Sequence, residues 1–110
     1  MSSTSGKGPP ELQIKLLGQF EVLRDGAPIP EEEWGRRKSR TLLKVLLTRP
    51  GRVFTSDELI EALFEGKDPA RAVSNLHGRV SQLRRALEPQ LPSGRESAFV
   101  IRREGGYCFA

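Results

Sequence analysis

Residues 69–87 carry a long amphipathic pattern, and this pattern constrains the fold more than any other feature of the sequence. Its apolar residues recur at the three- and four-residue spacing of an α-helix. Asp68 stands where an N-cap is expected, Pro69 occupies the favoured first helical position, and Pro89 follows the end. We therefore predict a helix of about five turns. Its buried stripe would consist of Val73, Leu76, Val80, Leu83 and Leu87.

The opposite face of this helix has no acidic side chain before Glu88. On a helical wheel it holds Arg71, Ser74, Gly78, Ser81, Gln82 and Arg85, with Asn75 and Arg79 on one flank and His77 and Arg84 on the other. A solvated face usually mixes charges of both signs. Arginine, glutamine, asparagine and serine are instead the residues that hydrogen-bond to base edges and phosphates. The face therefore predicts contact with nucleic acid.

Gly78 lies in the middle of this face, where glycine costs about 1 kcal/mol relative to alanine. Close approach of another molecule's backbone would explain the residue. Tolerance of one glycine by a long, well-capped helix explains it equally well.

The excess positive charge of the chain lies entirely in its C-terminal third. Residues 69–107 contain seven arginines and three glutamates, a net charge of +4, whereas the remaining 11 basic and 11 acidic residues cancel. Arginine suits phosphate and guanine because its planar fork donates two parallel hydrogen bonds. A solvated charged surface is the alternative, and charge alone does not decide between the two.

Strands are predicted on both sides of the helical region. Alternating apolar residues predict short strands around residues 12–16 and 20–22, and a third at 27–29 after the Asp25-Gly26 turn signal. Residues 31–33 form a loop or begin a helix. Near the C-terminus, residues 99–103 and 107–109 predict two strands joined at Glu104-Gly105-Gly106.

Two further helices are predicted between these strands. One spans about residues 36–48 and ends before Pro50-Gly51. The next begins at Thr55, which forms a capping-box pattern with Glu58. Their apolar stripes are Leu42, Leu43, Leu46 and Leu47 in the first, and Leu59, Ile60, Leu63 and Phe64 in the second.

Composition narrows the classes of function. Cys108 is the only cysteine and His77 the only histidine, so a disulfide, a zinc site or a catalytic triad has too few residues. No apolar run is long enough to cross a bilayer, and no signal peptide is visible. We expect a cytoplasmic, cofactor-free and metal-free protein that is not an enzyme. Residues 1–10 are expected to be disordered, and residues 11–110 to form one domain.

Helix, turn, helix and basic hairpin together describe a helix-turn-helix with a wing. The chain resembles the winged-helix domains of OmpR/PhoB-type response regulators, and still more the N-terminal domain of the Streptomyces antibiotic regulatory protein family. The resemblance covers nearly all of residues 12–109. It rests on LLGQFEVLRDGAPIP (16–30), RRKSRTLLKVLL (36–47), PGRVFTSDELIEALF (50–64), NLHGRVSQLRRALEP (75–89) and IRREGGYCF (101–109).

The resemblance implies an α+β winged helix-turn-helix fold with a four-stranded N-terminal antiparallel sheet, three helices and a C-terminal β-hairpin wing. It also implies that the third helix lies in the major groove of duplex DNA and that the wing tip touches the minor groove. By motif position, Phe64 replaces a tryptophan common in the family, and Ile101 replaces a phosphate-bonding threonine. The implied wing residues are Arg103 and Tyr107, and the implied recognition-helix residues are Ser74, Asn75, Arg79, Ser81, Gln82 and Arg84.

Gln82 stands where some relatives have a base-reading arginine, so their target sequence does not transfer. The loop Glu65-Gly66-Lys67 corresponds to a segment that such activators present to RNA polymerase. The module begins within about a dozen residues of Met1, so we expect a DNA-binding domain that comes first in a longer regulator, with a helical activation domain after it. The resemblance further implies binding to direct repeats, and we expect the isolated domain to be monomeric.

We therefore predict sequence-specific binding of duplex promoter DNA by a bacterial transcription regulator. The binding residues would be Arg71, Asn75, Arg79, Gln82 and Arg85 in the major groove and Arg102, Arg103 and Tyr107 at the wing. One alternative is a winged helix that binds proteins, which predicts an apolar patch on the third helix. Another is a nuclease, which needs clustered carboxylates. The basic third of the chain offers only the scattered Glu88, Glu96 and Glu104.

Overall fold

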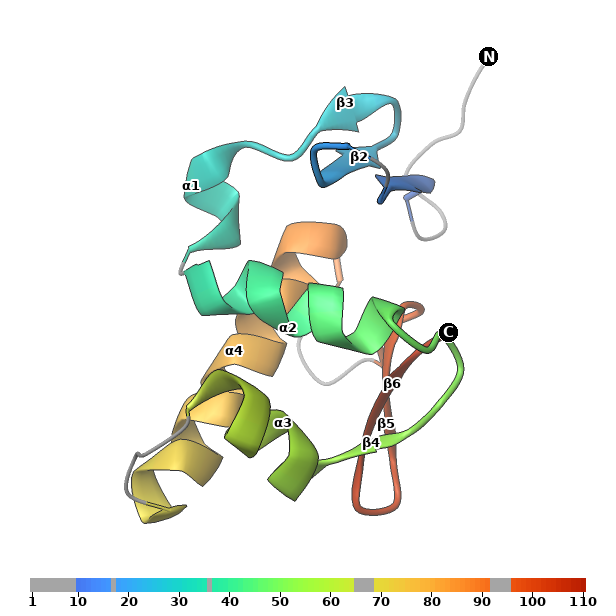
Figure 1. Cartoon of the computed structure of the whole chain (residues 1–110). Helices are drawn as coiled ribbons and strands as arrows, with labels where there is room; N and C mark the ends of the chain where they lie inside the picture. The colour runs from blue at the N-terminus through green and yellow to red at the C-terminus, as the bar shows by residue number, and fades with distance from the viewer. Residues whose placement is uncertain (1–9, 17, 36, 65–68, 92–95) are drawn as a thin grey trace.

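The computed structural model describes residues 10–16, 18–35, 37–64, 69–91 and 96–110. These residues form a small N-terminal sheet, four helices and a second small sheet at the C-terminus (Figure 1). The expected α+β architecture is confirmed. The expectations for the segment 1–9, the Asp68 cap and the loop 65–67 concern residues outside the described part.

The N-terminal sheet consists of β1 (Leu12–Lys15), β2 (Glu21–Arg24) and β3 (Ala27–Pro28), which pair antiparallel in that order. The Asp25-Gly26 turn between β2 and β3 has positive φ at both residues, 52° and 84°, as a type I′ hairpin turn requires. The expected fourth strand of this sheet is not present in the described residues. The next strand along the chain pairs in the C-terminal sheet instead.

Arg24 joins this sheet to the helices. Its Nη1 donates hydrogen bonds to the backbone carbonyl of Ala86 at 2.6 Å and to the Glu33 carboxylate at 2.7 Å. The hydrogen bond from Arg24 also holds the pKa of Glu33 below its ordinary value of 4.5. One guanidinium therefore contacts both the short helix that follows the sheet and the end of the long helix.

The helices are α1 (Glu31–Trp34), α2 (Arg37–Leu47), α3 (Ser56–Leu63) and α4 (Pro69–Leu87). Residues 31–33, for which a loop or a helix start was predicted, lie in the single turn of α1. The capping box at α3 is confirmed, because Thr55 Oγ1 accepts from the Glu58 N–H and the Glu58 carboxylate accepts from the Thr55 N–H. The ends of α4 match the sequence prediction.

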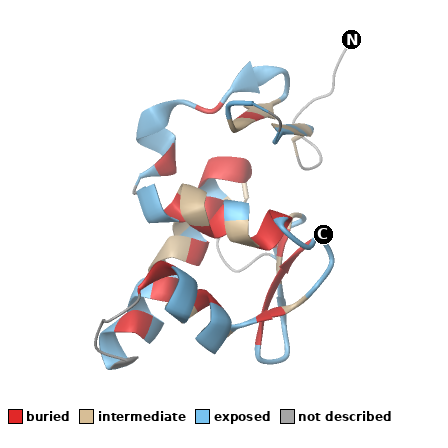
Figure 2. Cartoon of the chain, in the orientation of Figure 1, coloured by how far each residue is buried: buried red, intermediate tan, exposed pale blue. Residues whose placement is uncertain are grey.

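The core lies where α2, α3 and α4 meet, and their inward faces are buried (Figure 2). The stripes predicted for α2 and α3 are buried, except that Ile60 is half-exposed. The wing sheet and Val22, Ile29 and Trp34 from the N-terminal part close the same core. One hydrophobic cluster therefore joins both sheets to the three longer helices.

Val73 was predicted to be buried in α4, and this prediction is wrong. Its side chain is 45% exposed, whereas that of its neighbour Ala72 is 0% exposed. The buried side of α4 runs through Ala72, Leu76 and Leu83, so Val73 lies about 100° around the helix from its buried neighbour. Helical spacing alone cannot decide which of two adjacent apolar residues faces the core.

The C-terminal sheet contains β4 (Phe54–Thr55), β5 (Val100–Arg103) and β6 (Gly106–Phe109), in the order β4-β6-β5. The hairpin β5–β6 is the predicted wing, and the two-residue strand β4 was not predicted. Gly106 pairs with Thr55, and a Cβ added at Gly106 would lie 2.0 Å from the carbonyl oxygen of Phe54. Only glycine therefore allows β4 to approach β6 this closely.

No helix in the described part of the chain is long and apolar enough to span a membrane. Over the same residues, no group of three histidine, cysteine or acidic side chains is arranged to hold a metal ion.

Candidate nucleic-acid interface

The exposed side of α4 carries most of the residues proposed to contact DNA. Arg71, Ser74, Asn75, Ser81 and Arg85 are exposed, as is His77. Gly78, Arg79, Gln82 and Arg84 are half-buried. The wheel therefore places most of the face correctly, but Gly78 and Gln82 of that face are partly covered, and each flank has one exposed and one half-buried residue.

The middle of the exposed face of α4 carries only short side chains. Ser74, Gly78 and Ser81 follow one another at helical spacing and have small side chains. A Cβ added at Gly78 would meet nothing within 4 Å, so no packing inside the molecule requires glycine there. Arg71 and Arg85 stand one turn beyond either end of this strip. The arrangement lets another molecule approach the helix backbone closely between two cationic side chains.

Gln82 was expected on the open face, but its amide is held by other parts of the chain. Ser39 of α2 is fully buried, and its Oγ donates a hydrogen bond of 2.9 Å to Gln82 Oε1. Gly35 lies on the other side of the amide. It has a φ of 74°, and a Cβ at Gly35 would overlap Gln82 Nε2 at 1.8 Å. No sequence pattern predicts this contact, because 43 residues separate Ser39 from Gln82.

Arg84 joins α4 to the wing. Its Nε donates to the carbonyl oxygen of Val100 at 3.1 Å, and its guanidinium carbon lies 5.8 Å from the centroid of the Tyr107 ring. Tyr107 itself is buried, at 5% exposure. Arg84 and Tyr107 thus hold the wing against the helix, whereas the family resemblance implied that both contact DNA.

Glu88, at the end of α4, anchors the base of the wing. Its buried carboxylate accepts hydrogen bonds from the hydroxyl of Ser97 and from the backbone N–H of Ala98. The Ser97 hydroxyl oxygen in turn accepts from the N–H groups of Phe99 and Val100. By sequence alone, Glu88 is only one of three acidic residues in residues 69–107 that are not clustered. In the structure its carboxylate fixes the start of β5.

The wing tip exposes two adjacent arginines. Arg102 and Arg103 are exposed, and Arg103 pairs with Gly106 across the hairpin. Ile101 is half-buried, and Cys108 is buried in β6, as expected for a residue of the terminal strand. Because β5 is an edge strand of its sheet, the side chains of Arg102 and Arg103 lie at the exposed edge of that sheet.

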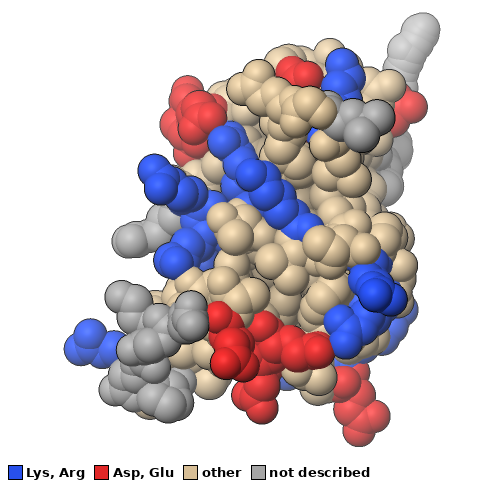
Figure 3. Space-filling model, in the orientation of Figure 1, with Lys and Arg blue, Asp and Glu red and all other residues tan. Residues whose placement is uncertain are grey.

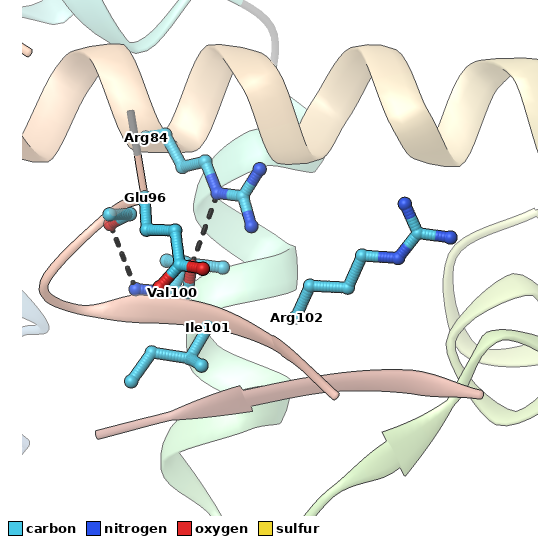
Figure 4. Close-up of a pocket in the computed structure, with 6 residues that line it drawn as sticks. Arg84, Glu96, Val100, Ile101 and Arg102 are labelled. Atoms are coloured by element: carbon cyan, nitrogen blue, oxygen red, sulfur yellow. Dashed lines mark hydrogen bonds between the residues drawn. The ribbon is translucent and has the colours of Figure 1, made fainter. Parts of the chain in front are cut away.

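A pocket of about 220 Å³ lies between α4 and β5 (Figure 4). Arg84 points from the helix toward β5, and Arg102 rises from β5 on the same side of the pocket. The other lining residues are Glu96, Ser97, Val100 and Ile101. The described lining of the pocket therefore combines two cations with one carboxylate.

Basic and acidic side chains are separated on the neighbouring helices (Figure 3). Arg37, Lys38 and Lys44 are exposed on α2, and Lys38 Nζ donates to the carbonyl of Leu63 at the end of α3. The exposed acids of α3 are Asp57, Glu58 and Glu61. Arg37 and Lys38 near the start of α2 were not among the residues proposed from the sequence. Lys38 lies against the end of α3, where its Nζ also lies over the ring of Phe64.

The family comparison supports the same architecture. Residues 31–109 match the family described as "Transcriptional regulatory protein, C terminal". AfsR of Streptomyces coelicolor is 32% identical over 91 residues, which are 83% of this chain and 9% of AfsR. EmbR of Mycobacterium tuberculosis is 37% identical over 76 residues, which are 69% of this chain and 19% of EmbR. MoaR1 of the same species is 34% identical over 76 residues, or 24% of its length.

Among solved structures, this chain resembles Mycobacterium tuberculosis EmbR in complex with a low affinity phosphopeptide. The TM-score is 0.73 at 31% sequence identity, and the match covers 92% of this chain and 25% of EmbR. The chain thus spans about a tenth to a quarter of the relatives that it matches. Because the family match covers most of its residues, the chain belongs to the family of transcriptional regulatory protein C-terminal domains, with the winged-helix fold of the OmpR/PhoB type.

Proposed function

We propose that this chain is the promoter-reading domain of a bacterial transcription regulator and binds duplex DNA in a sequence-specific manner. In this proposal α4 enters the major groove and the tip of the β5–β6 wing lies at the minor groove. The observation that carries the proposal is the exposed face of α4, which holds two arginines at its ends, amide and hydroxyl side chains between them and no carboxylate. These are the groups that bind phosphates and base edges.

In this proposal the residues of α4 have different tasks. Arg71 and Arg85 suit phosphates or guanine at the two ends of the face, and Asn75 and Ser81 suit base edges. The row of short side chains around Gly78 allows the helix to enter the groove deeply. Arg37 and Lys38 on α2 would add contacts to the phosphate backbone.

Val73 adds an apolar contact that the sequence did not suggest. Its exposed side chain lies one helical turn before the exposed His77, on one flank of the proposed DNA-binding helix. An exposed aliphatic group on this flank suits the methyl group of thymine. We include Val73 among the proposed base contacts.

A protein-binding module remains the second candidate, but no described feature favours it. It needs a contiguous apolar patch. In the described part of the chain, Leu16 and Val73 are the exposed large hydrophobic residues, and Leu16 lies in the N-terminal part, away from α4 in the sequence. Contact with RNA polymerase through the loop 65–67 and binding to direct repeats also remain proposals, as does a monomeric state of the isolated domain.

Salt-dependent binding tests the proposed function. With about five phosphates neutralised, log K should fall against log salt with a slope near −0.9 per phosphate, so about −4.5 in total. Arg71→Ala and Arg85→Ala should each reduce this slope by about one. Lys15→Ala is the control, because Lys15 is an exposed cation on β1 in the N-terminal sheet. Failure to bind any duplex at low salt would exclude the proposal.

A further inference from the structure

The amide of Gln82 is fixed in one orientation by two elements outside α4. Ser39 Oγ donates to Gln82 Oε1 from a fully buried position, and the Nε2 end of the amide lies against the exposed Gly35. Because a Cβ at position 35 would overlap both Nε2 and Cδ of Gln82, only glycine leaves room for this side chain. The carbonyl oxygen therefore points toward the buried Ser39, and Nε2 lies beside the exposed Gly35.

This orientation restricts which base edges Gln82 can bind. A free glutamine pairs with adenine through one donor and one acceptor. Here the carbonyl oxygen is engaged by Ser39, so the outer edge offers its N–H donors. In the major groove guanine presents two acceptors, O6 and N7, and thymine presents O4, whereas adenine presents its N7 acceptor beside a donating amino group and cytosine presents an amino group alone.

We propose that Ser39 is a positioning residue that makes Gln82 a donor-only contact. Gln82 consequently selects a keto base, guanine or thymine, most strongly over cytosine and less strongly over adenine, with which it can no longer form the two-bond contact of a free amide. This inference rests on the proposed DNA-binding function. A glutamine with a free amide would instead pair with adenine. Arg37 is exposed near the start of α2 and is close in sequence to Ser39. It can bind the phosphate next to the base that Gln82 contacts.

The test is selection from randomised duplexes with the 110-residue chain, followed by sequencing of the bound fraction. The wild type should show one position where guanine or thymine is favoured by about five- to tenfold, the effect of one hydrogen bond. Gln82→Glu keeps an acceptor for Ser39 but exposes an acceptor instead of a donor. This variant should therefore invert the preference at that position toward adenine or cytosine and leave the other positions unchanged.

Ser39→Ala releases the amide, which can then turn and pair with adenine through both of its ends. The keto preference should fall to less than twofold at the same position. Thr41→Ala is the matched control on α2, because its hydroxyl bonds to the carbonyl of Arg37 in its own helix. Gln13→Glu on the exposed side of β1 controls for the added negative charge. Thermal unfolding verifies that each variant is folded.

Unchanged profiles for both Ser39→Ala and Gln82→Glu, beside a wild type with clear sequence preference, would overturn this inference alone. The contact would then only tie α4 to α2. A wild type that binds no duplex would overturn the proposed function together with it. If Ser39→Ala unfolds, Gln82→Glu alone decides, since a purely structural contact cannot invert a preference at a single base.

Discussion

The Nε of Arg84 on the proposed DNA-binding helix donates a hydrogen bond to the carbonyl oxygen of Val100 on the first wing strand. Its guanidinium also lies over the ring of Tyr107 on the second wing strand. One side chain thus fixes the wing relative to α4. Two grooves of one duplex can be contacted at once only if these elements keep their relative position.

Replacement of Arg84 by alanine should therefore lower the stability of the fold. We expect the free energy of unfolding to fall by about 2 kcal/mol, since the lost hydrogen bond involves a charged donor. Arg85→Ala removes an exposed neighbour and should change stability by less than about 0.5 kcal/mol. Urea denaturation measures both values. Equal midpoints for Arg84→Ala and the wild type would show that this contact does not hold the wing.

Arg103 at the wing tip is expected to enter the minor groove, while Arg102 holds the backbone. Neighbouring strand residues point to opposite faces, and a narrow A·T-rich minor groove attracts an inserted arginine. Arg103→Ala should weaken binding most at sites flanked by an A-tract. Arg102→Ala should weaken all sites similarly and reduce the salt slope by about one. Titration against A-tract-flanked and G·C-flanked sites measures the difference.

A uniform small loss with both wing variants would favour a different role for these arginines. Charged side chains on an edge strand also prevent pairing with other chains, and β5 is such an edge. In that case aggregation, followed by light scattering, should increase in both variants while site preference stays constant.

Val73 is expected to contact a thymine methyl group. Burial of one methyl-sized group contributes about 0.8 kcal/mol, or about fourfold in affinity. Replacing the contacted thymine by deoxyuridine should weaken the wild type by this factor, and Val73→Ala should no longer distinguish the two bases. Leu16→Ala, at the other exposed large hydrophobic residue, should respond to the substitution as the wild type does. Equal losses in all three proteins would contradict the contact.

Glu58 should make the stability of the domain depend on pH in the acid range. The hydrogen bond from the Thr55 backbone, followed by that from Arg52, lowers the pKa of Glu58 from its ordinary value of 4.5. A group with a lower pKa in the folded state stabilises the fold above its unfolded pKa, and this contribution is lost as pH falls through the folded value.

The wild type should consequently be more stable than Glu58→Gln at neutral pH, and the difference should shrink as pH falls below 4.5. Glu61→Gln lies on the same helix outside the capping box and serves as the control. Urea denaturation at neutral and acid pH measures each difference. A gap between the wild type and Glu58→Gln that is independent of pH would contradict the prediction.

The sequence predicted those features that depend on local chemistry. The capping box of α3 and the ends of α4 follow from residues close together in the chain, such as Thr55 with Glu58 and Pro69 at the helix start. The inward faces of α2 and α3 follow from dense leucine stripes. Hydrophobic patterns and turn signals predicted the order of the elements, and the family resemblance is confirmed by the family match.

The features that the sequence missed depend on contacts between distant segments. Strand β4 has only two residues, and it exists because Gly106 allows close pairing with Thr55. Val73 and Ala72 both fit helical spacing, and only the positions of the neighbouring elements decide that Ala72 is buried. Gln82 is polar and lies on the exposed side of the wheel, but Ser39 and Gly35 hold its amide.

The separation of charge between α3 and α4 has a consequence for the rate of association. Exposed acids occupy α3, whereas α4 carries arginines and no acid. In the proposed function, a duplex that approaches the acidic helix would be repelled and one that approaches the arginines would be attracted, so the protein would turn toward the proposed binding orientation before contact. At low ionic strength association should therefore be faster, and a larger fraction of encounters should lead to binding. As salt is added, the association rate constant should fall before the dissociation rate constant rises.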